Sequence, residues 1–126
     1  MARVLVVDVI GDKGIYEAEC NELNDYYEHL KCDCFDIACR KIGDKYFDMF
    51  VDDVGLFQDN PIPSVFDTEM NPMLVGNVII ANHDIEGNTT SLTDEDIAVI
   101  KAHTVGLVYF DTDPIKSYTA VYPVYY

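Results

Sequence analysis

Basic residues are scarce in this chain: of its 126 residues, 8 are Lys or Arg and 23 are Asp or Glu, so the formal net charge is −15. Eight dispersed cations do not build a basic surface of useful size, which argues against direct binding of nucleic acid or another polyanion. Disorder is not expected, because 49% of the residues are hydrophobic and nine Tyr and six Phe are present. We therefore expect a folded acidic protein.

Long hydrophobic runs are also absent. The longest early apolar run, Val4 to Ile10, is interrupted by Asp8 and is too short to cross a bilayer. It lacks the small-residue cleavage site of a signal peptide, so we expect a cytoplasmic protein that makes no contact with membranes. The length predicts one domain over residues 1–126.

Catalytic signatures are missing as well. His29, His83 and His103 share no motif. Asp84 follows His83 and can hold the tautomer of its imidazole, but no Ser or Cys at nucleophile spacing completes a triad. We expect no catalytic residues, no cofactor and no enzymatic activity.

Metal sites have only weak candidates. The chain has four cysteines, Cys20, Cys32, Cys34 and Cys39. The first three can be drawn with His29 as a Cys₃His zinc site, but the spacing matches no familiar knuckle. Reduced cysteines that pack as small hydrophobes are the preferred interpretation. The carboxylate candidates for Ca²⁺ or Mg²⁺ do not have EF-hand spacing either; they are Asp52 and Asp53 with Asp59, and Asp111 with Asp113.

The pattern of apolar residues predicts an α+β fold: a single domain with a mostly antiparallel sheet of about five to seven strands and two helices. Strands are expected over residues 3–10, 15–18, 33–40, 45–51, 73–81, 105–110 and 118–126, the last at an edge of the sheet. Residues 52–72 and 82–90 are expected to be irregular. No internal repeat is predicted.

Two segments have the signs of helices. Asn21 is the expected N-cap of a helix over residues 22–31, whose apolar stripe comprises Leu23, Tyr26, Tyr27 and Leu30. Thr93 is the expected N-cap of a second helix that ends near His103. Asp96 stands three residues after Thr93, at the position of the acidic member of a capping box.

The negative charge is concentrated in the middle of the chain. Residues 44–96 contain twelve acids and one base, Lys45, which is a net charge of −11. These acids are the candidate partner-binding residues: Asp44, Asp48, Asp52, Asp53, Asp59, Asp67, Glu69, Asp84, Glu86, Asp94, Glu95 and Asp96. One interpretation is a solvated surface that maintains solubility. The other is a surface that imitates a phosphate backbone.

Tyrosines crowd the last 18 residues. Tyr118, Tyr122, Tyr125 and Tyr126 are candidate aromatic anchors, because Tyr offers a rigid apolar body and a polar tip. An aromatic edge strand can also pair with a second copy and form a homodimer. Ordinary packing within the sheet is the alternative.

Three motifs stand out: the Val-Leu-Val-Val strand within Arg3 to Val9, the Gly76 strand from Val75 to Ile80, and the Ser-Leu-Thr-Asp-Glu helix cap that begins at Ser91. With these motifs the chain resembles an uncharacterised domain-of-unknown-function family of small proteins from phages, plasmids and conjugative elements of gut anaerobes. The resemblance covers residues 3–103, and residues 104–126 are expected to be a C-terminal strand extension. It implies a mobile-element setting, often near anti-restriction functions, and no catalytic residue.

Two functions follow as hypotheses. The first is a non-enzymatic inhibitor that blocks a host nucleic-acid-binding defence effector by nucleic-acid mimicry, of the anti-CRISPR or anti-restriction type, and whose partner is a host protein with a basic surface. The alternative is a sponge that sequesters a host signalling nucleotide, with the loop 52–72 and tyrosines stacking on its base. That alternative requires Arg3, Arg40 and Lys41 to converge in one pocket, because a protein with a net charge of −15 otherwise repels phosphates.

Overall fold

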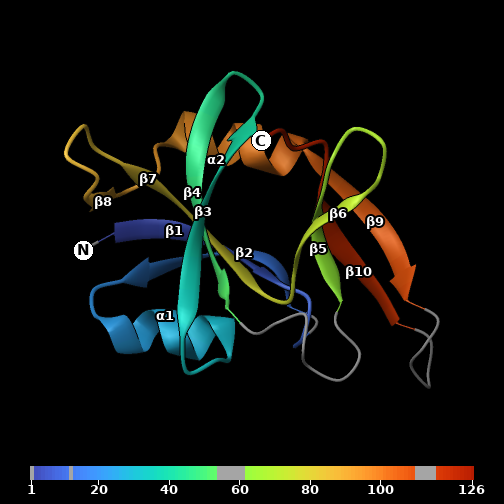
Figure 1. Cartoon of the computed structure of the whole chain (residues 1–126), viewed down its shortest axis with the longest axis horizontal. Coiled ribbons are helices and arrows are strands. Elements are labelled where there is room, and N and C mark those ends of the chain that lie inside the picture. Colours follow the sequence, from blue (N-terminus) through green and yellow to red (C-terminus); the bar gives the residue numbers. More distant parts are fainter. Residues whose placement is uncertain (1, 12, 54–61, 110–115) are drawn as a thin grey trace.

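Two β-sheets and two helices make up the protein, which is described from a computed structural model (Figure 1). The structure describes residues 2–11, 13–53, 62–109 and 116–126. The strands of the first sheet are β1 Ala2–Asp8, β2 Gly14–Cys20, β3 Phe35–Ile42, β4 Lys45–Asp52, β7 Val78–His83 and β8 Thr89–Thr90. The strands of the second sheet are β5 Pro63–Phe66, β6 Pro72–Val75, β9 Thr104–Tyr109 and β10 Lys116–Val121. The helices are α1 Leu23–Leu30 and α2 Asp94–Ala102.

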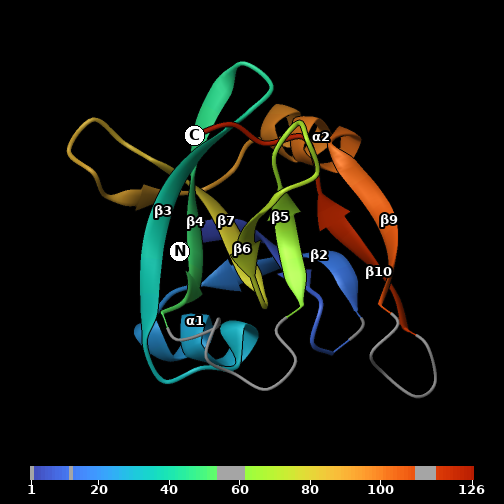
Figure 2. The same cartoon turned by 45° about the vertical axis from the view of Figure 1, so that its right-hand side comes forward.

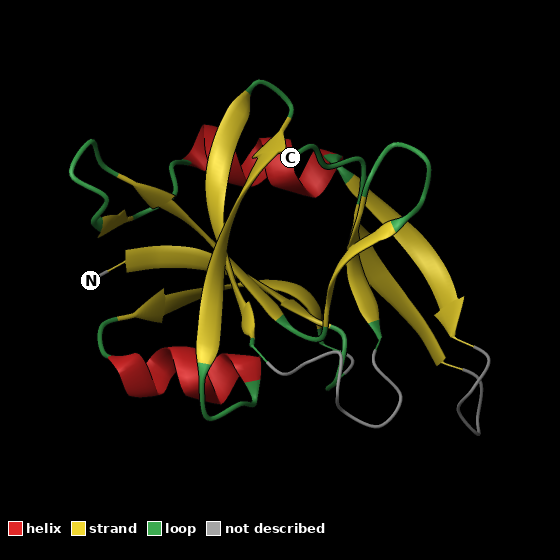
Figure 3. Ribbon diagram, viewed as in Figure 1, coloured by secondary structure: helices red, strands yellow, loops and turns green. Residues whose placement is uncertain are grey.

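The first sheet has the spatial order β2-β1-β7-β4-β3, with β8 beside β7, and all its pairs are antiparallel. The second sheet has the order β6-β5-β10-β9, and its β10–β5 pair is parallel. The predicted α+β class, the two helices and the mostly antiparallel pairing are confirmed (Figure 3). The strands form two sheets, however, where the sequence predicted one.

Strand β1 is almost continuously apolar because both of its faces are buried. Leu5 and Val7 point into a core that the two sheets share with α2. Val4 and Val6 point to the opposite face and join a second core beneath α1, which includes Leu30. Successive side chains of a strand alternate between faces, so this sheet can carry a helix and a second sheet at once. No described helix is long and apolar enough to span a bilayer.

Helix α2 begins as the sequence predicts. The hydroxyl of Thr93 accepts a hydrogen bond from the backbone N–H of Asp96 at 3.1 Å, and the carboxylate of Asp96 accepts one from the N–H of Thr93 at 2.9 Å. This reciprocal pair is a capping box with Asp in the usual Glu position. His103 is the C-cap.

Helix α1 begins one residue later than predicted. Its N-cap is Glu22 and not Asn21, and Asp25 accepts hydrogen bonds from the backbone N–H groups of both residues. Leu23 therefore occupies the first helical position and is 62% exposed, so it is absent from the predicted apolar stripe. The buried residue of α1 is Leu30.

The segment 73–81 is predicted to form one strand, but it is divided between β6 in one sheet and β7 in the other. Gly76 has a φ of 77°, a left-handed conformation that glycine adopts without steric cost. Asn77 is 1% exposed; its carbonyl oxygen accepts the N–H of Val9 at 2.9 Å, and its amide donates to Asp8 at 2.8 Å. The turn at Gly76 and this buried amide direct the chain from one sheet into the other.

Three further predictions about strands are wrong. Residues 52–72 are not irregular throughout, because they contain β5 and the first residue of β6. The predicted polar loop 82–90 includes the end of β7 and all of β8. The predicted edge strand 118–126 ends at Val121 as β10 and lies between β5 and β9. Pairing between distant strands depends on tertiary neighbours, which local propensity does not encode.

Candidate functional site

Three hairpin turns and the first turn of α2 carry carboxylates in the upper half of the molecule in Figures 1 and 2, where the β7–β8 turn lies at the left and the β5–β6 turn toward the right. These seven residues, called the acidic end from here on, are Asp44 in the β3–β4 turn, Asp67 and Glu69 in the β5–β6 turn, Asp84 and Glu86 in the β7–β8 turn, and Asp94 and Glu95 in α2. They belong to four separate segments of the chain, and only the fold brings them to the same half of the molecule.

Two of these turns share a five-residue pattern, Asp-x-Glu-x-Asn, over residues 67–71 and 84–88. In each, the Asp carboxylate accepts the backbone N–H groups two and four residues later, at 2.9 and 2.8 Å in the first turn and 3.0 and 2.8 Å in the second. The closing Asn also donates its side-chain amide to that Asp, at 3.3 and 3.2 Å. These two turns, called the twin turns, are closed by the same hydrogen bonds, and the spacing of Asp and Asn is the signal of them in the sequence.

The hydrogen bonds of the twin turns also stabilise their charge. Those from Asn71 are the main cause of a lowered pKa at Asp67, and those from Asn88 are the main cause of a lowered pKa at Asp84. A carboxylate that accepts several N–H groups favours its ionised form. Each twin turn therefore fixes the carboxylate of its first residue, Asp67 or Asp84, by hydrogen bonds. The third residue, Glu69 or Glu86, is exposed.

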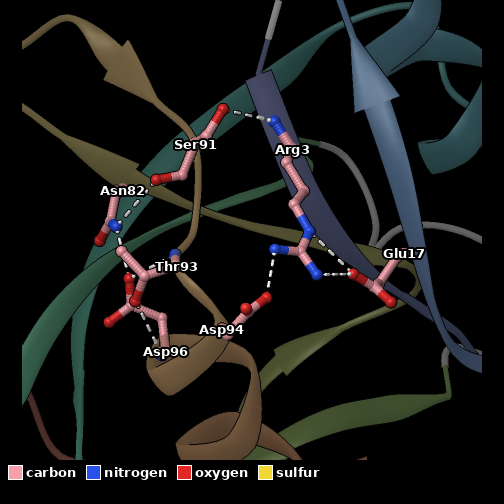
Figure 4. A network of polar contacts seen from close by, with 7 residues as sticks. All are labelled: Arg3, Glu17, Asn82, Ser91, Thr93, Asp94 and Asp96. Atoms are coloured by element: carbon pink, nitrogen blue, oxygen red, sulfur yellow. Dashed lines mark hydrogen bonds and ion pairs between the residues drawn. The ribbon is translucent and has the colours of Figure 1, made fainter.

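The run of acids at residues 94–96 is divided by the fold (Figure 4). The side chain of Asp94 is 91% exposed and accepts a hydrogen bond from Arg3 at 2.7 Å. Arg3 also donates through its Nε to Glu17 at 2.8 Å, and its backbone N–H donates to the hydroxyl of Ser91 at 2.9 Å. Asp94 is thus a surface group that links the start of α2 to β1.

Asp96 belongs to the interior, with 6% exposure. Its carboxylate accepts hydrogen bonds from the Asn82 amide at 2.7 Å and from Lys45 Nζ at 3.0 Å, in addition to the capping bond from Thr93. Burial raises the pKa of Asp96, but the hydrogen bonds from Thr93, Lys45 and Asn82 together outweigh burial and lower the pKa to about 2. The structure therefore leaves Asp96 out of the exposed acids.

The remaining acids of the predicted set lie elsewhere. Asp48 has a side chain that is 16% exposed and lies 3.2 Å from Nδ1 of His83. Asp52 and Asp53 lie at the far end of β4 from the β3–β4 turn, so they are not part of the acidic end. Asp59 lies outside the described residues. The twelve predicted acids thus do not form a single face.

Exposed tyrosines gather beside the β3–β4 hairpin. Tyr46, Tyr125 and Tyr126, called the tyrosine patch, are 48%, 46% and 74% exposed. The hydroxyl of Tyr46 donates to the carbonyl oxygen of Tyr126 at 3.4 Å. Tyr118 packs against the core and Tyr122 is half-buried, so these two predicted anchors are less accessible. Tyr46 was missed because nothing local in the sequence links it to the C-terminal tyrosines.

The basic residues required by the nucleotide-binding alternative do not converge. Arg3 lies on β1, and β7 and β4 separate it from the two candidates on β3. Arg40 stacks 4.8 Å from the ring centre of Tyr126, and Lys41 lies 6.0 Å from that of Tyr46. No specific observation therefore favours a phosphate pocket built from these three cations.

The cysteines are all free thiols: Cys20 is buried, Cys32 is half-buried and the other two are exposed. Burial raises the pKa of both Cys20 and Cys32 to about 11, which keeps these two thiols protonated. Within the described part of the chain, no group of three or more His, Cys, Asp or Glu is arranged to hold a metal ion. The candidate ligands Asp111 and Asp113 lie outside that part.

Taken together, the chain is an acidic α+β protein in which three hairpin turns and the first turn of α2 hold one group of surface carboxylates, while others lie around α1 and on β2 and β3. It belongs to the family described as Domain of unknown function (DUF3846), whose model matches residues 2–104. Comparisons with curated proteins and with solved structures gave no match. The matched segment ends at the first residue of β9, and β10, which follows it, lies between β5 and β9 in the second sheet.

Proposed function

We propose that this chain is a non-enzymatic inhibitor, made by a phage or another mobile element, that acts in the cytoplasm of a bacterial host. Its target is a defence protein whose basic groove normally holds nucleic acid. The observation that carries the proposal is the acidic end, where four separate segments contribute carboxylates to one side of the molecule. Carboxylates on a protein surface can take the place of phosphates against Lys and Arg side chains.

Arg3 pairs with Asp94, but nearby cations neutralise only a small part of the charge of the acidic end. Lys45 is already bound to the interior carboxylate of Asp96, and Arg3 is shared between Glu17 and Asp94. The twin turns hold their aspartates by backbone hydrogen bonds, so part of the negative charge is rigidly placed before a partner arrives. Preorganised charges cost less ordering on binding than charges on mobile side chains.

The tyrosine patch supplies an apolar component for the same interface. Tyr46 of this patch lies on β4, next to the β3–β4 turn that carries Asp44, and Tyr125 pairs with Lys41 of β3. Tyrosine is enriched among residues that dominate binding energy, because it buries a large rigid ring and keeps a polar tip. We expect the acidic end to attract the partner and the tyrosine patch to slow its dissociation.

The first test is affinity capture from a nuclease-treated lysate of a bacterial host, with salt-step elution and mass spectrometry. We expect a nucleic-acid-binding protein that moderate salt releases and that added DNA or RNA displaces, because salt screens exposed charges. Binding that is indifferent to salt and to nucleic acid contradicts the proposal. A nucleotide that co-purifies without a protein partner favours the sequestration of a signalling nucleotide instead.

A pair of matched variants tests whether position or net charge matters. Each variant replaces three exposed acids by amides, so each has a net charge of −15 + 3 = −12. The acidic-end variant carries Asp44→Asn, Glu69→Gln and Glu86→Gln, and the control variant carries Glu28→Gln, Asp33→Asn and Asp53→Asn. We expect the acidic-end variant to lose about tenfold or more in affinity for the captured protein, and the control to stay close to wild type. Equal losses exclude a defined acidic interface.

A further inference from the structure

No further inference is drawn: the strongest candidate, the outer edge of strand β3 beside the exposed side chain of Ile37, carries nothing because the described part of the chain does not show what covers it.

Discussion

Carboxylates in the interior of the protein and carboxylates at the acidic end are both stabilised by hydrogen bonds, but they differ in how strongly burial opposes their ionisation. Asp8 and Asp96 are 2% and 6% exposed, while Asp67 and Asp84 stand in hairpin turns at the surface. At all four sites, hydrogen bonds to the carboxylate lower its pKa. Burial opposes this effect most in the interior, so the interior carboxylates depend on their partners for the stability of the fold. The surface carboxylates meet a smaller burial penalty, so their ionised form depends less on such partners.

The largest expected difference between interior and surface acids is the loss of stability when the side chain is replaced by alanine. Asp96→Ala removes the acceptor for Lys45, Asn82 and the capping bond of α2, so we expect a loss of about 3 kcal/mol in the free energy of unfolding. Asp94→Ala, two residues away and exposed, is expected to cost at most about 1 kcal/mol. Urea unfolding of the two variants measures both values. Similar losses would erase the distinction between interior and surface acids.

Lowering the pH should reveal the same difference between interior and surface acids. The pKa of Asp96 is lowered from 3.8 to about 2 in the folded chain, so its contribution of about 2 kcal/mol is complete above pH 3.8 and disappears as the pH falls through 2. The measurement is the unfolding free energy of wild type and Asp96→Asn between pH 5 and pH 2. We expect the difference between them to shrink as the pH falls. A constant difference means that the charge of Asp96 does not stabilise the fold.

Reciprocal substitutions in the twin turns are expected to have smaller effects on stability, of opposite sign. The fourth positions of the two turns both have left-handed backbones: Met70 has a φ of 63° and Gly87 a φ of 84°. A side chain in that region costs roughly 1–2 kcal/mol, partly offset by the greater flexibility of unfolded glycine. We expect Met70→Gly to stabilise the protein by about 0.5 kcal/mol and Gly87→Met to destabilise it by a similar amount. Thermal or urea unfolding checks both signs, and changes of the same sign would show that the turns are not equivalent.

The smallest expected effect is at the glutamates in the middle of the twin turns. Glu69→Gln and Glu86→Gln remove exposed charges that make no described hydrogen bond, so we expect stability changes within about 0.5 kcal/mol. The sign should be stabilising at low salt, because like charges repel, and the change should vanish at high salt. Unfolding at two salt concentrations measures this. A loss of stability at both concentrations would assign these residues a structural role.

Local patterns predicted the parts of the fold that depend on neighbours in the sequence. The apolar run from residue 3 predicted β1, and the strands at 33–40 and 45–51 correspond to the β3–β4 hairpin. Thr93 and Asp96 predicted the start of α2, because a capping box needs only residues three positions apart. Such features arise from short-range hydrogen bonds and from alternation, which a sequence displays directly.

Long-range features were not predictable in the same way. Gly76 and Asn77 look like members of one apolar strand, and their role in dividing it depends on Asp8 and Val9 from the other end of the domain. The C-terminal strand was expected at an edge, but it lies between β5 and β9 because a pairing partner sits in a segment expected to be irregular. Neither outcome follows from propensity, since each depends on distant neighbours.

The sequence by itself determined the net charge, the alternation of the strands, the caps of α2 and the spacing of Asp and Asn in the twin turns. The tertiary structure decided which acids remain in water. Within three consecutive residues, Asp94 is exposed and Asp96 is buried, because Asn82 and Lys45 arrive from other strands to hydrogen-bond the latter. A carboxylate can leave water only where such partners replace its hydration, and those partners are brought together by the fold.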